Sequence, residues 1–311
     1  MIAKSLPKRL IAAGSLSLAL LLAACGKTPE AAGTPAEIRF SVVGAEDAAQ
    51  MAQYWQPLVD DLQKKTGLKV KLFFSPNYSL LVQAMASKQT QLAWFSALPA
   101  VEATERANAE VFARTIDEHG SGAYQSVILA RKDSDLTQEK LMACDKTLDF
   151  GIGDAQSTTG TLAPLTFLFR PAGKTPQDCF KTVRSANHQA NLLAVANGLV
   201  DAATNNTTGL AFYRTGTPEA QAAIGKTKVI WTSPDLPESA MVYRKDLDPA
   251  AQAKIRDFFL SYGKGEGSQA EHERAVLKTL KYSRFEAADN DYLKPVVEMR
   301  NAQAAATAAA K

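Results

Sequence analysis

The chain has 311 residues, of which 46% are hydrophobic and 22% charged, a composition that excludes a disordered chain, a collagen-like repeat and a protein with many membrane spans. Its formal net charge is +3, but three of its 35 basic residues and none of its 32 acidic residues lie in the first 24 positions, which leaves 32 of each sign in the remainder. A body without excess positive charge lacks the electrostatic signature of nucleic-acid binding, so we expect no nucleic-acid partner.

Residues 1–24 have the features of a secretory signal peptide. A basic segment precedes fifteen uncharged residues, Leu10 to Ala24, which are too few to span a hydrocarbon core of about 30 Å. The segment ends in Leu-Ala-Ala-Cys, which resembles a bacterial lipobox and predicts that Cys25 is lipidated and becomes the first mature residue. Ordinary cleavage beside an incidental cysteine is the alternative. Residues 25–36 then predict a flexible tether, so that lipid would anchor the body to a membrane surface.

The next part of the chain predicts a unit of alternating strands and helices. Apolar residues recur at helical spacing after Asp47, which can cap the helix, and Gly67 ends it. Met51 and Trp55 on this helix are assigned to core packing. Strand–helix–strand order indicates a parallel sheet covered by helices. The predicted elements are strands over 37–44, 68–74 and 91–95 and helices over 48–62 and 79–87.

A second unit of the same kind follows. The segment over 80–94, a helix, a tight break and a strand, has a weak echo in 192–203. Residues 124–131 and 230–245 have the character of links between two lobes, and the chain from Asp248 onward is predicted to be helical. Two lobes with paired connections indicate a hinge and a cleft. The predicted elements of this unit are strands over 148–153, 181–185 and 199–203 and helices over 159–169, with a kink at Pro164, and 189–196.

Cys144 and Cys179 are the two cysteines left after Cys25. Each precedes a predicted strand, and parallel strands begin at the same edge of a sheet, so the two thiols can meet. Export to an oxidising compartment permits a disulfide between them. Two buried free thiols are the alternative. A zinc site is not expected, because two cysteines and three scattered histidines show no ligand spacing.

Small polar residues follow several predicted strands at the point where a helix begins. In an open α/β sheet, ligands bind beyond the carboxyl ends of the strands, and free N–H groups at a helix start favour an anion. Each of these residues has a plainer interpretation as a helix cap, a surface residue or packing. Together they predict a cleft lined by uncharged donors. The segments are 77–79, 157–159, 185–188 and 205–208.

Seven landmarks in order make the sequence similar to the phosphate-, phosphite- and phosphonate-binding proteins of ABC transporters, from about Ile38 to Val297. The landmarks are Pro76-Asn77-Tyr78, Gln91 to Phe95, Gly122-Ala123-Tyr124, Ser157 to Gly160, His188 with Leu193 to Gly198, Asp201 to Thr207, and Leu236-Pro237 before Arg244 to Leu247.

The resemblance implies a type II periplasmic binding protein fold, an α/β architecture in which two βαβ lobes are joined by two crossover strands around a ligand cleft. We expect one lobe over 37–131 and 236–311 and the other over 132–235. The residues that the resemblance places on a phosphorus oxyanion are Tyr78, Tyr124, Ser157, Thr158, Thr159 and His188, and a second group expected in the cleft is Trp94, Ser96, Asn206 and Thr208.

The sequence departs from the family where aminoalkylphosphonates are recognised. Relatives of that kind carry two acids at the positions of Thr208 and Ser239 here, and the neighbouring Glu238 is expected to face away, since a shift of one residue in an extended segment reverses its side chain. We therefore expect phosphite or a small alkylphosphonate as ligand. Aminoalkylphosphonate, phosphate, a sulfonate or nitrate, and service as a sensor remain alternatives.

We expect a binding protein that delivers its ligand to an inner-membrane permease from the periplasm, as a monomer and without metal or cofactor. The alternative from a different class is a hydrolase with Ser157 as nucleophile, His188 as base and Asp201 as orienting acid. That interpretation lacks the Gly-x-Ser-x-Gly motif of a nucleophile elbow, and the binding interpretation accounts for all three residues.

Overall fold

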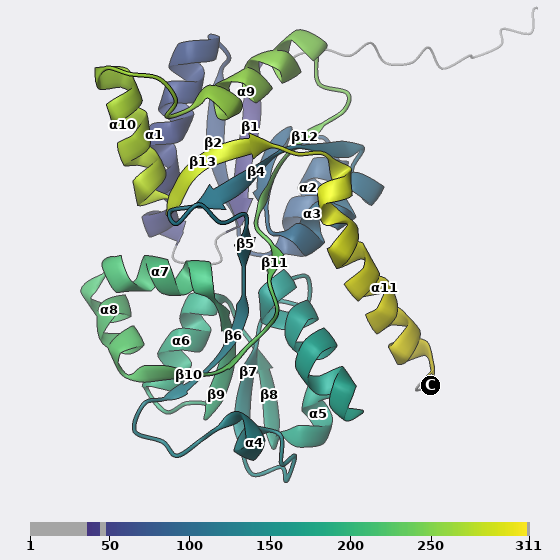
Figure 1. The fold of residues 1–311 in the computed structure, drawn as a ribbon. Coiled ribbons are helices and arrows are strands. Elements are labelled where there is room, and N and C mark those ends of the chain that lie inside the picture. The colour runs from purple at the N-terminus through teal and green to yellow at the C-terminus, as the bar shows by residue number, and fades with distance from the viewer. Residues whose placement is uncertain (1–35, 44–47, 310–311) are drawn as a thin grey trace, which may run out of the picture. The chain divides into compact units, whose positions relative to one another are not determined.

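The structure is a computed structural model that describes residues 36–43 and 48–309 (Figure 1). The predicted signal peptide, the lipidation site Cys25, the tether before residue 36 and the helix cap Asp47 lie outside these ranges. Within the two ranges, no helix is long and apolar enough to cross a membrane.

The first lobe is built on a mixed sheet of six strands. Its elements are β1 (Ile38–Val43), α1 (Ala48–Thr66), β2 (Val70–Ser75), α2 (Tyr78–Ala86), β3 (Leu92–Phe95), α3 (Ala97–Arg106), β4 (Ala109–Asp117), β12 (Ala240–Arg244), α9 (Pro249–Ser261), α10 (Ser268–Thr279), β13 (Tyr282–Ala287), the 3₁₀-helix η4 (Asn290–Leu293) and α11 (Lys294–Ala309). The strand order is β13-β4-β12-β3-β1-β2. β1 is parallel to β2 and β3, as predicted, whereas β12 runs antiparallel to β3 and β4.

Both faces of this sheet are covered by helices, because its strands alternate their apolar side chains. In β12, Met241 and Tyr243 pack with α1, α9 and α10, while Ala240 and Val242 pack with α2, α3 and α11. Figure 1 shows α1 and α10 together on one side of the sheet. Burial of both faces holds each strand at a defined position in the sheet. It thereby also positions the residues that follow the end of each strand.

The second lobe is built on a five-stranded sheet. Its elements are β6 (Ser126–Arg131), α4 (Gln138–Leu141), β7 (Asp149–Ile152), the π-helical segments η1 (Thr158–Leu162) and η2 (Leu165–Phe169), the 3₁₀-helix η3 (Arg170–Ala172), α5 (Pro176–Cys179), β8 (Thr182–Ser185), α6 (His188–Ala196), β9 (Ala202–Asn206), α7 (Thr207–Thr215), α8 (Pro218–Gly225) and β10 (Thr227–Thr232). The strand order is β10-β6-β9-β7-β8, with β7 parallel to β8 and β9.

The two sheets share one layout, which accounts for the weak sequence echo. In each sheet, three parallel strands are arranged so that the earliest of them in the chain lies between the other two, and an antiparallel strand lies next in the sheet. The order β2-β1-β3-β12 in the first lobe therefore corresponds to β8-β7-β9-β6 in the second. The echoed segments, α2 to β3 and α6 to β9, occupy corresponding places. The two-lobe α/β architecture is therefore confirmed.

Two short strands connect the lobes. β5 (Ala123–Tyr124) and β11 (Leu236–Pro237) pair antiparallel, with Leu236 opposite Tyr124. The chain continues from β5 directly into β6, which belongs to the sheet of the second lobe because it pairs with β9 and β10. The predicted lobe boundary after residue 131 thus differs from the strand pairing, which places the change of lobe between β5 and β6.

The Thr159–Phe169 helix predicted in the second lobe is π-helical at both ends rather than a regular α-helix. The Gly153 N–H bonds to the Gly160 carbonyl at 2.9 Å, and a Cβ on Gly153 would lie 2.5 Å from the Gly160 Cα atom. Only glycine permits this close approach of two backbones, which presses the start of the helix against the end of β7. π-Helical turns are frequent at functional sites.

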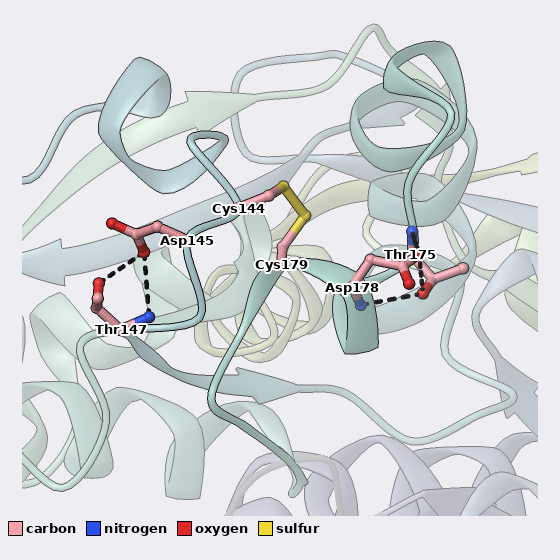
Figure 2. Close-up of a disulfide and its surroundings, with 6 residues drawn as sticks. All are labelled: Cys144, Asp145, Thr147, Thr175, Asp178 and Cys179. Carbon is pink, nitrogen blue, oxygen red and sulfur yellow. Dashed lines mark hydrogen bonds between the residues drawn. A yellow bond between two sulfur atoms is a disulfide. The ribbon is translucent and has the colours of Figure 1, made fainter.

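Cys144 and Cys179 form a disulfide and precede β7 and β8 by a few residues, and these strands pair in parallel as expected (Figure 2). Each cysteine lies next to a local hydrogen-bonded turn. The Asp145 carboxylate accepts from the Thr147 N–H and hydroxyl, and Thr175 forms a capping box with Asp178. The bridge therefore joins two ordered turns near the starts of the parallel strands β7 and β8, at the opposite edge of the sheet from their carboxyl ends.

Four elements of the first lobe differ from the prediction. α3 and β4 lie in a stretch for which no element was predicted, β12 lies in the segment predicted to link the lobes, and β13 lies in the region predicted to be helical throughout. β13 pairs antiparallel with β4 at the edge of the sheet. The break before β13 is made by Lys281 at a φ of 61°, a left-handed conformation without a glycine to signal it.

Candidate functional site

A small cavity of about 40 Å³ lies between residues of the two lobes. Among the described residues, uncharged side chains dominate its wall, with one acid and no lysine or arginine. The lining residues are Met51, Trp55, Tyr78, Trp94, Ser96, Tyr124, Thr159, His188, Asn206, Thr208, Gly209, Phe212, Glu238, Ser239 and Tyr282.

Five helical segments begin at this cavity. Tyr78 and His188 are the first residues of α2 and α6, Ser96 and Asn206 are the caps of α3 and α7, and Thr159 is the second residue of η1; all five line the cavity. In four of them the cap side chain accepts from a backbone N–H of the first turn, as Asn187 does from the Ala190 N–H at 2.8 Å. Because the start of each helix carries a partial positive charge, the cavity favours an anion even though its described wall holds no lysine or arginine.

Three buried polar groups at the cavity have no hydrogen-bond partner among the described residues. They are the Trp55 indole N–H, the Tyr124 hydroxyl and Nδ1 of His188, on side chains that are 1%, 6% and 5% exposed. Leaving a buried donor unpaired costs about 1–3 kcal/mol. Three such groups around one cavity indicate a ligand that supplies hydrogen-bonding partners.

Burial keeps two of these groups uncharged. It raises the pKa of Tyr124 well above its usual range, and the nearby Glu238 carboxylate adds to the rise. The hydroxyls of Thr158 and Thr159 lie close enough to offset part of this effect, yet neither completes a hydrogen bond to Tyr124. Burial also lowers the pKa of His188 to about 4. At neutral pH both side chains therefore act as neutral hydrogen-bonding groups.

Most residues expected at the ligand line this cavity. They are Tyr78, Tyr124, Thr159 and His188 from the first set and Trp94, Ser96, Asn206 and Thr208 from the second. Ser157 borders an adjoining cavity of about 190 Å³, which shares Tyr78 and His188 with the first. The Ser157 oxygen accepts from the Gly160 N–H at 2.9 Å, so its own hydrogen is available for another partner.

Thr158 differs from the expectation, because it lines neither cavity and instead joins the lobes. Its Oγ1 accepts from the Leu98 N–H at 2.8 Å and donates to Ser96 Oγ at 3.3 Å. The side chain is fully buried. A hydroxyl of the second lobe thus caps the first turn of α3 in the first lobe, where Ser96 makes no cap bond of its own.

The expectation that Glu238 faces away from the cleft is wrong. Glu238 is 1% exposed and lines the cavity. Its Oε2 accepts from Thr208 Oγ1 at 3.0 Å, and its Oε1 accepts from the N–H and the hydroxyl of Ser239, each at 3.0 Å. The expected alternation of side chains along an extended strand does not apply to Glu238, because the pairing of β11 with β5 ends at Pro237. The two residues that replace the expected acids therefore hold a neighbouring acid in place.

Some cavity residues were not anticipated as such from the sequence. Met51 and Trp55 belong to the buried core, as predicted, and they line the cavity as well. Tyr282, predicted to lie in a helix, is the first residue of β13 and also lines the cavity. Tyr282 accepts from the Trp94 indole N–H at 3.1 Å, and burial raises its pKa well above the usual range. An aromatic residue on a helix face next to a strand end has no sequence signal that separates core from cavity.

The residues of the hydrolase alternative do not form a catalytic relay. Ser157 Oγ accepts from a backbone N–H, and His188 Nδ1 has no partner in the described structure. Asp201 is exposed before the start of β9 and accepts from the Asp149 N–H at 2.8 Å, whereas the cavity lies at the other end of that strand, at Asn206. Over residues 36–43 and 48–309, no group of three or more His, Cys, Asp or Glu is arranged to hold a metal ion.

Comparisons with known proteins agree with this geometry. Residues 40–293 match a family described as "ABC transporter, phosphonate, periplasmic substrate-binding protein". The chain is 38% identical over 263 residues to the phosphonates-binding periplasmic protein of Escherichia coli K12, covering 84% of this chain and 75% of that one.

Solved structures are similar over most of the chain. A binding protein component of an ABC phosphonate transporter from Pseudomonas aeruginosa has a TM-score of 0.83 at 34% identity, over 88% of this chain and 89% of that one. PhnD1 from Prochlorococcus marinus, in complex with methylphosphonate, has a TM-score of 0.74 at 20% identity, over 86% and 97%, which is a likeness of fold.

Proposed function

Because the chain belongs to the family of periplasmic substrate-binding proteins of phosphonate ABC transporters, we propose that it binds phosphite or a small alkylphosphonate between its lobes and delivers it to the permease. Members of this family are binding proteins and not enzymes. The chemistry and the size of the cavity support a ligand of this kind.

The observation that carries the proposal is a pair of unpartnered polar groups beside the helix starts at the cavity. Among the described residues, neither the Tyr124 hydroxyl on β5 nor Nδ1 of His188 at the start of α6 has a hydrogen-bond partner. Thr159, on the π-helical segment η1, lines the same cavity. A tetrahedral phosphorus group with three oxygens offers acceptors in several directions at once. Uncharged donors and helix dipoles can hold such a group at close range without a salt bridge.

The size of the cavity supports a small ligand. A volume of about 40 Å³ accommodates roughly three water molecules, since each needs about 10–15 Å³ on this measure. Trp94 and Phe212 add an apolar wall on which a P–H or P–CH₃ group loses no hydrogen bond. A fourth oxygen, as in phosphate, would leave an unpaired polar atom against such a wall.

The test is a thermal-shift and calorimetric series with the mature protein and equal concentrations of phosphite, methylphosphonate, phosphate and 2-aminoethylphosphonate. A ligand at 100 times its dissociation constant stabilises the protein by about 2.7 kcal/mol. We expect phosphite or methylphosphonate to give the largest shift. A larger shift with phosphate or 2-aminoethylphosphonate would contradict the proposed ligand, and no shift with any of the four would contradict the function.

We propose further that the mature protein is a monomer anchored through lipid on Cys25. The support is the sequence before residue 36, with its basic start, short apolar run and Leu-Ala-Ala-Cys motif. A Cys25→Ser variant should lose the lipid and either remain unprocessed or leave the membrane fraction. Mass spectrometry of the mature N-terminus decides this point, and light scattering of the soluble body decides the oligomeric state.

A further inference from the structure

Glu238 is an acid for which the described part of the cavity wall provides no compensating cation. Among the residues of 36–43 and 48–309 that line the cavity it is the one acid, and none is lysine or arginine. A carboxylate has about four acceptor positions. Ser239 fills two of them at Oε1 through its N–H and hydroxyl, and Thr208 fills one at Oε2. Oε2 therefore retains one acceptor position.

The groups around Glu238 do not neutralise it. Tyr124, Tyr282 and Tyr292 lie within its electrostatic reach as neutral hydroxyls, and Asp117 adds a further negative charge. On the cavity wall, His188 is held in its neutral form by burial.

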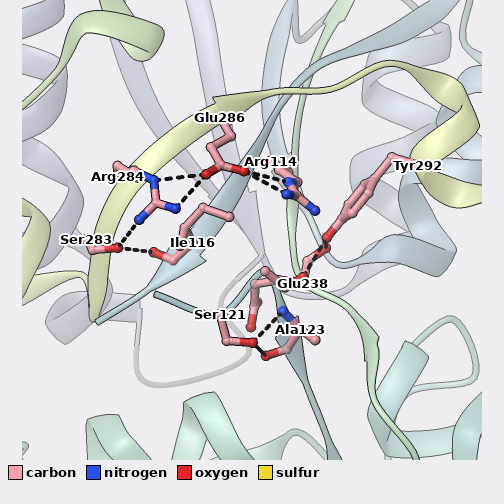
Figure 3. A network of polar contacts seen from close by, with 10 residues as sticks. Arg114, Ile116, Ser121, Ala123, Glu238, Ser283, Arg284, Glu286 and Tyr292 are labelled. Carbon is pink, nitrogen blue, oxygen red and sulfur yellow. Dashed lines mark hydrogen bonds and ion pairs between the residues drawn. The ribbon is translucent and has the colours of Figure 1, made fainter. Parts of the chain in front are cut away.

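Arg114, which lies over the Tyr292 ring, is paired with another acid. It bonds to Glu286 at 2.6 Å and stacks over the Tyr292 ring at 5.4 Å, while Tyr292 bonds to the backbone carbonyl of Glu238 and not to its carboxylate (Figure 3). Burial without a cation raises the pKa of Glu238.

An oxyanion in the same cavity brings negative charge and acceptors next to this carboxylate. Two ionised groups at about 4 Å repel strongly when water is excluded, and two acceptors cannot bond to each other. The contact becomes favourable when one hydrogen lies between them. That hydrogen can belong to an acidic P–OH group of the ligand, to an ammonium group, or to Glu238 itself after uptake of one proton from solvent.

Resting on the proposed function, we infer that Glu238 is a specificity-determining residue, which admits an oxyanion able to share a hydrogen with its carboxylate and rejects one that offers acceptors only. Two ligand chemistries satisfy this requirement. A phosphonate or phosphite binds with one proton shared between a phosphorus oxygen and the carboxylate, and an aminoalkylphosphonate uses its ammonium group. A sulfonate of the same shape satisfies neither, because its oxygens carry no proton near neutral pH.

Calorimetry on the wild-type mature protein tests this inference without any variant. Methylphosphonate, methanesulfonate and 2-aminoethylphosphonate are titrated at a pH above the second ionisation of methylphosphonate, in two buffers of different ionisation enthalpy, to count protons taken up. We expect methylphosphonate to bind with close to one proton taken up per ligand. Methanesulfonate should bind at least about 100-fold more weakly. Uptake near zero with 2-aminoethylphosphonate would identify the ammonium group as the source of the hydrogen.

A Glu238→Gln variant sharpens the test, because its amide offers a permanent donor and no charge. We expect proton uptake to disappear and the preference for methylphosphonate over methanesulfonate to fall at least about tenfold. Glu273→Gln is the matched control, since Glu273 is also 1% exposed but bonds to Lys65 and the Gly263 N–H outside the cavity. It should retain the wild-type preference.

Two results would overturn the inference. Binding of methylphosphonate without proton uptake, together with equal affinity for methanesulfonate, would remove the role of Glu238 and leave the proposed function intact. Absence of binding by any phosphorus oxyanion, to the wild type and to Glu238→Gln alike, would remove both. Equal proton uptake in the wild type and in a folded Glu238→Gln variant would also refute the assignment, because another group would then carry the proton.

Discussion

The starts of α2 and α6 occupy equivalent places in the two lobes, and they carry different chemistry on the same frame. Each helix has an asparagine cap, Asn77 or Asn187, which accepts from the third N–H of its helix at 2.9 or 2.8 Å. The next residue is Tyr78 in one lobe and His188 in the other, and both line the cavity at 4% and 5% exposure. A repeated fold therefore positions two side chains symmetrically while their hydrogen-bonding abilities differ.

The helical segments after the equivalent strands β1 and β7, α1 and η1, differ more strongly. α1 is a regular helix that presents Met51 and Trp55 to the cavity, whereas η1 begins with hydroxyl groups and is held close to β7 by Gly153 and Gly160. The first lobe thus supplies much of the aromatic wall, and the second supplies the backbone and hydroxyl cradle. We expect changes in the two lobes to affect binding and stability in different ways.

The largest difference concerns the disulfide, which the described first lobe lacks. A Cys144→Ser, Cys179→Ser double variant should lower the free energy of unfolding by about 2–4 kcal/mol, since the bridge closes a loop across 35 positions. Denaturant unfolding followed by fluorescence measures the loss, and ligand affinity at low denaturant should change little. Quantitative thiol labelling of the unfolded, unreduced wild type is the direct check, and two free thiols there would contradict the bridge.

His188 should make the ligand-free protein sensitive to acid in a way that Tyr78 does not. Its pKa of about 4 in the folded state lies below the usual value of 6.5, so the unfolded chain binds more protons between these values. The stability linked to His188 is complete above about pH 6.5 and is lost as the pH falls towards 4, by roughly 3 kcal/mol.

Glu238 works against this trend, because its raised pKa favours the folded state at low pH and removes stability as the pH rises above 4.5. The comparison of wild type with His188→Gln isolates the histidine. Urea unfolding at pH 7 and pH 4 should show the larger loss in the wild type, and Tyr78→Phe should keep the wild-type profile. Parallel profiles for wild type and His188→Gln would show that His188 does not titrate as described.

Ligand affinity should also fall when His188 is removed. Loss of a hydrogen bond to a charged partner costs about 1.5–3 kcal/mol, which corresponds to a roughly tenfold to hundredfold rise in the dissociation constant for His188→Ala. Calorimetry with methylphosphonate measures it, with circular dichroism to establish that the variant is folded. His119→Ala is the control, since His119 is an exposed histidine that is not among the residues lining the cavity. Unchanged affinity in His188→Ala would move the oxyanion to other donors.

The smallest expected effect is at Trp55. Its indole N–H has no partner in the described structure, so Trp55→Phe removes a buried unpaired donor and should cost the ligand-free protein little beyond the lost volume. If this N–H reaches the ligand, affinity should fall by about fivefold. Trp94→Phe provides the contrast, because the Trp94 N–H is already bonded to Tyr282. Equal effects of the two substitutions on affinity would assign both rings to packing alone.

The sequence predicted those parts of the fold that depend on strong periodicity and on glycine or capping residues. The strands of both βαβ units, the end of α1 at Gly67 and the pairing of the cysteines before parallel strands follow such signals. β13 does not, because the chain turns at Lys281 without a glycine or a proline. The orientation of the Glu238 side chain was also not predicted correctly. Side chains alternate between the two faces of a paired strand, and β11 is paired with β5 only at Leu236 and Pro237.

The hydrogen bond from the Leu98 N–H to Thr158 Oγ1 links the amide of one lobe to the hydroxyl of the other. When the lobes separate, that amide returns to water, because Ser96 offers it no alternative cap. The deuterium exchange rate of a single backbone hydrogen therefore reports the time that the lobes spend apart. Saturating ligand should slow exchange at Leu98 in proportion to the closed fraction, while the Leu80 amide, capped within its own lobe by Asn77, keeps its rate.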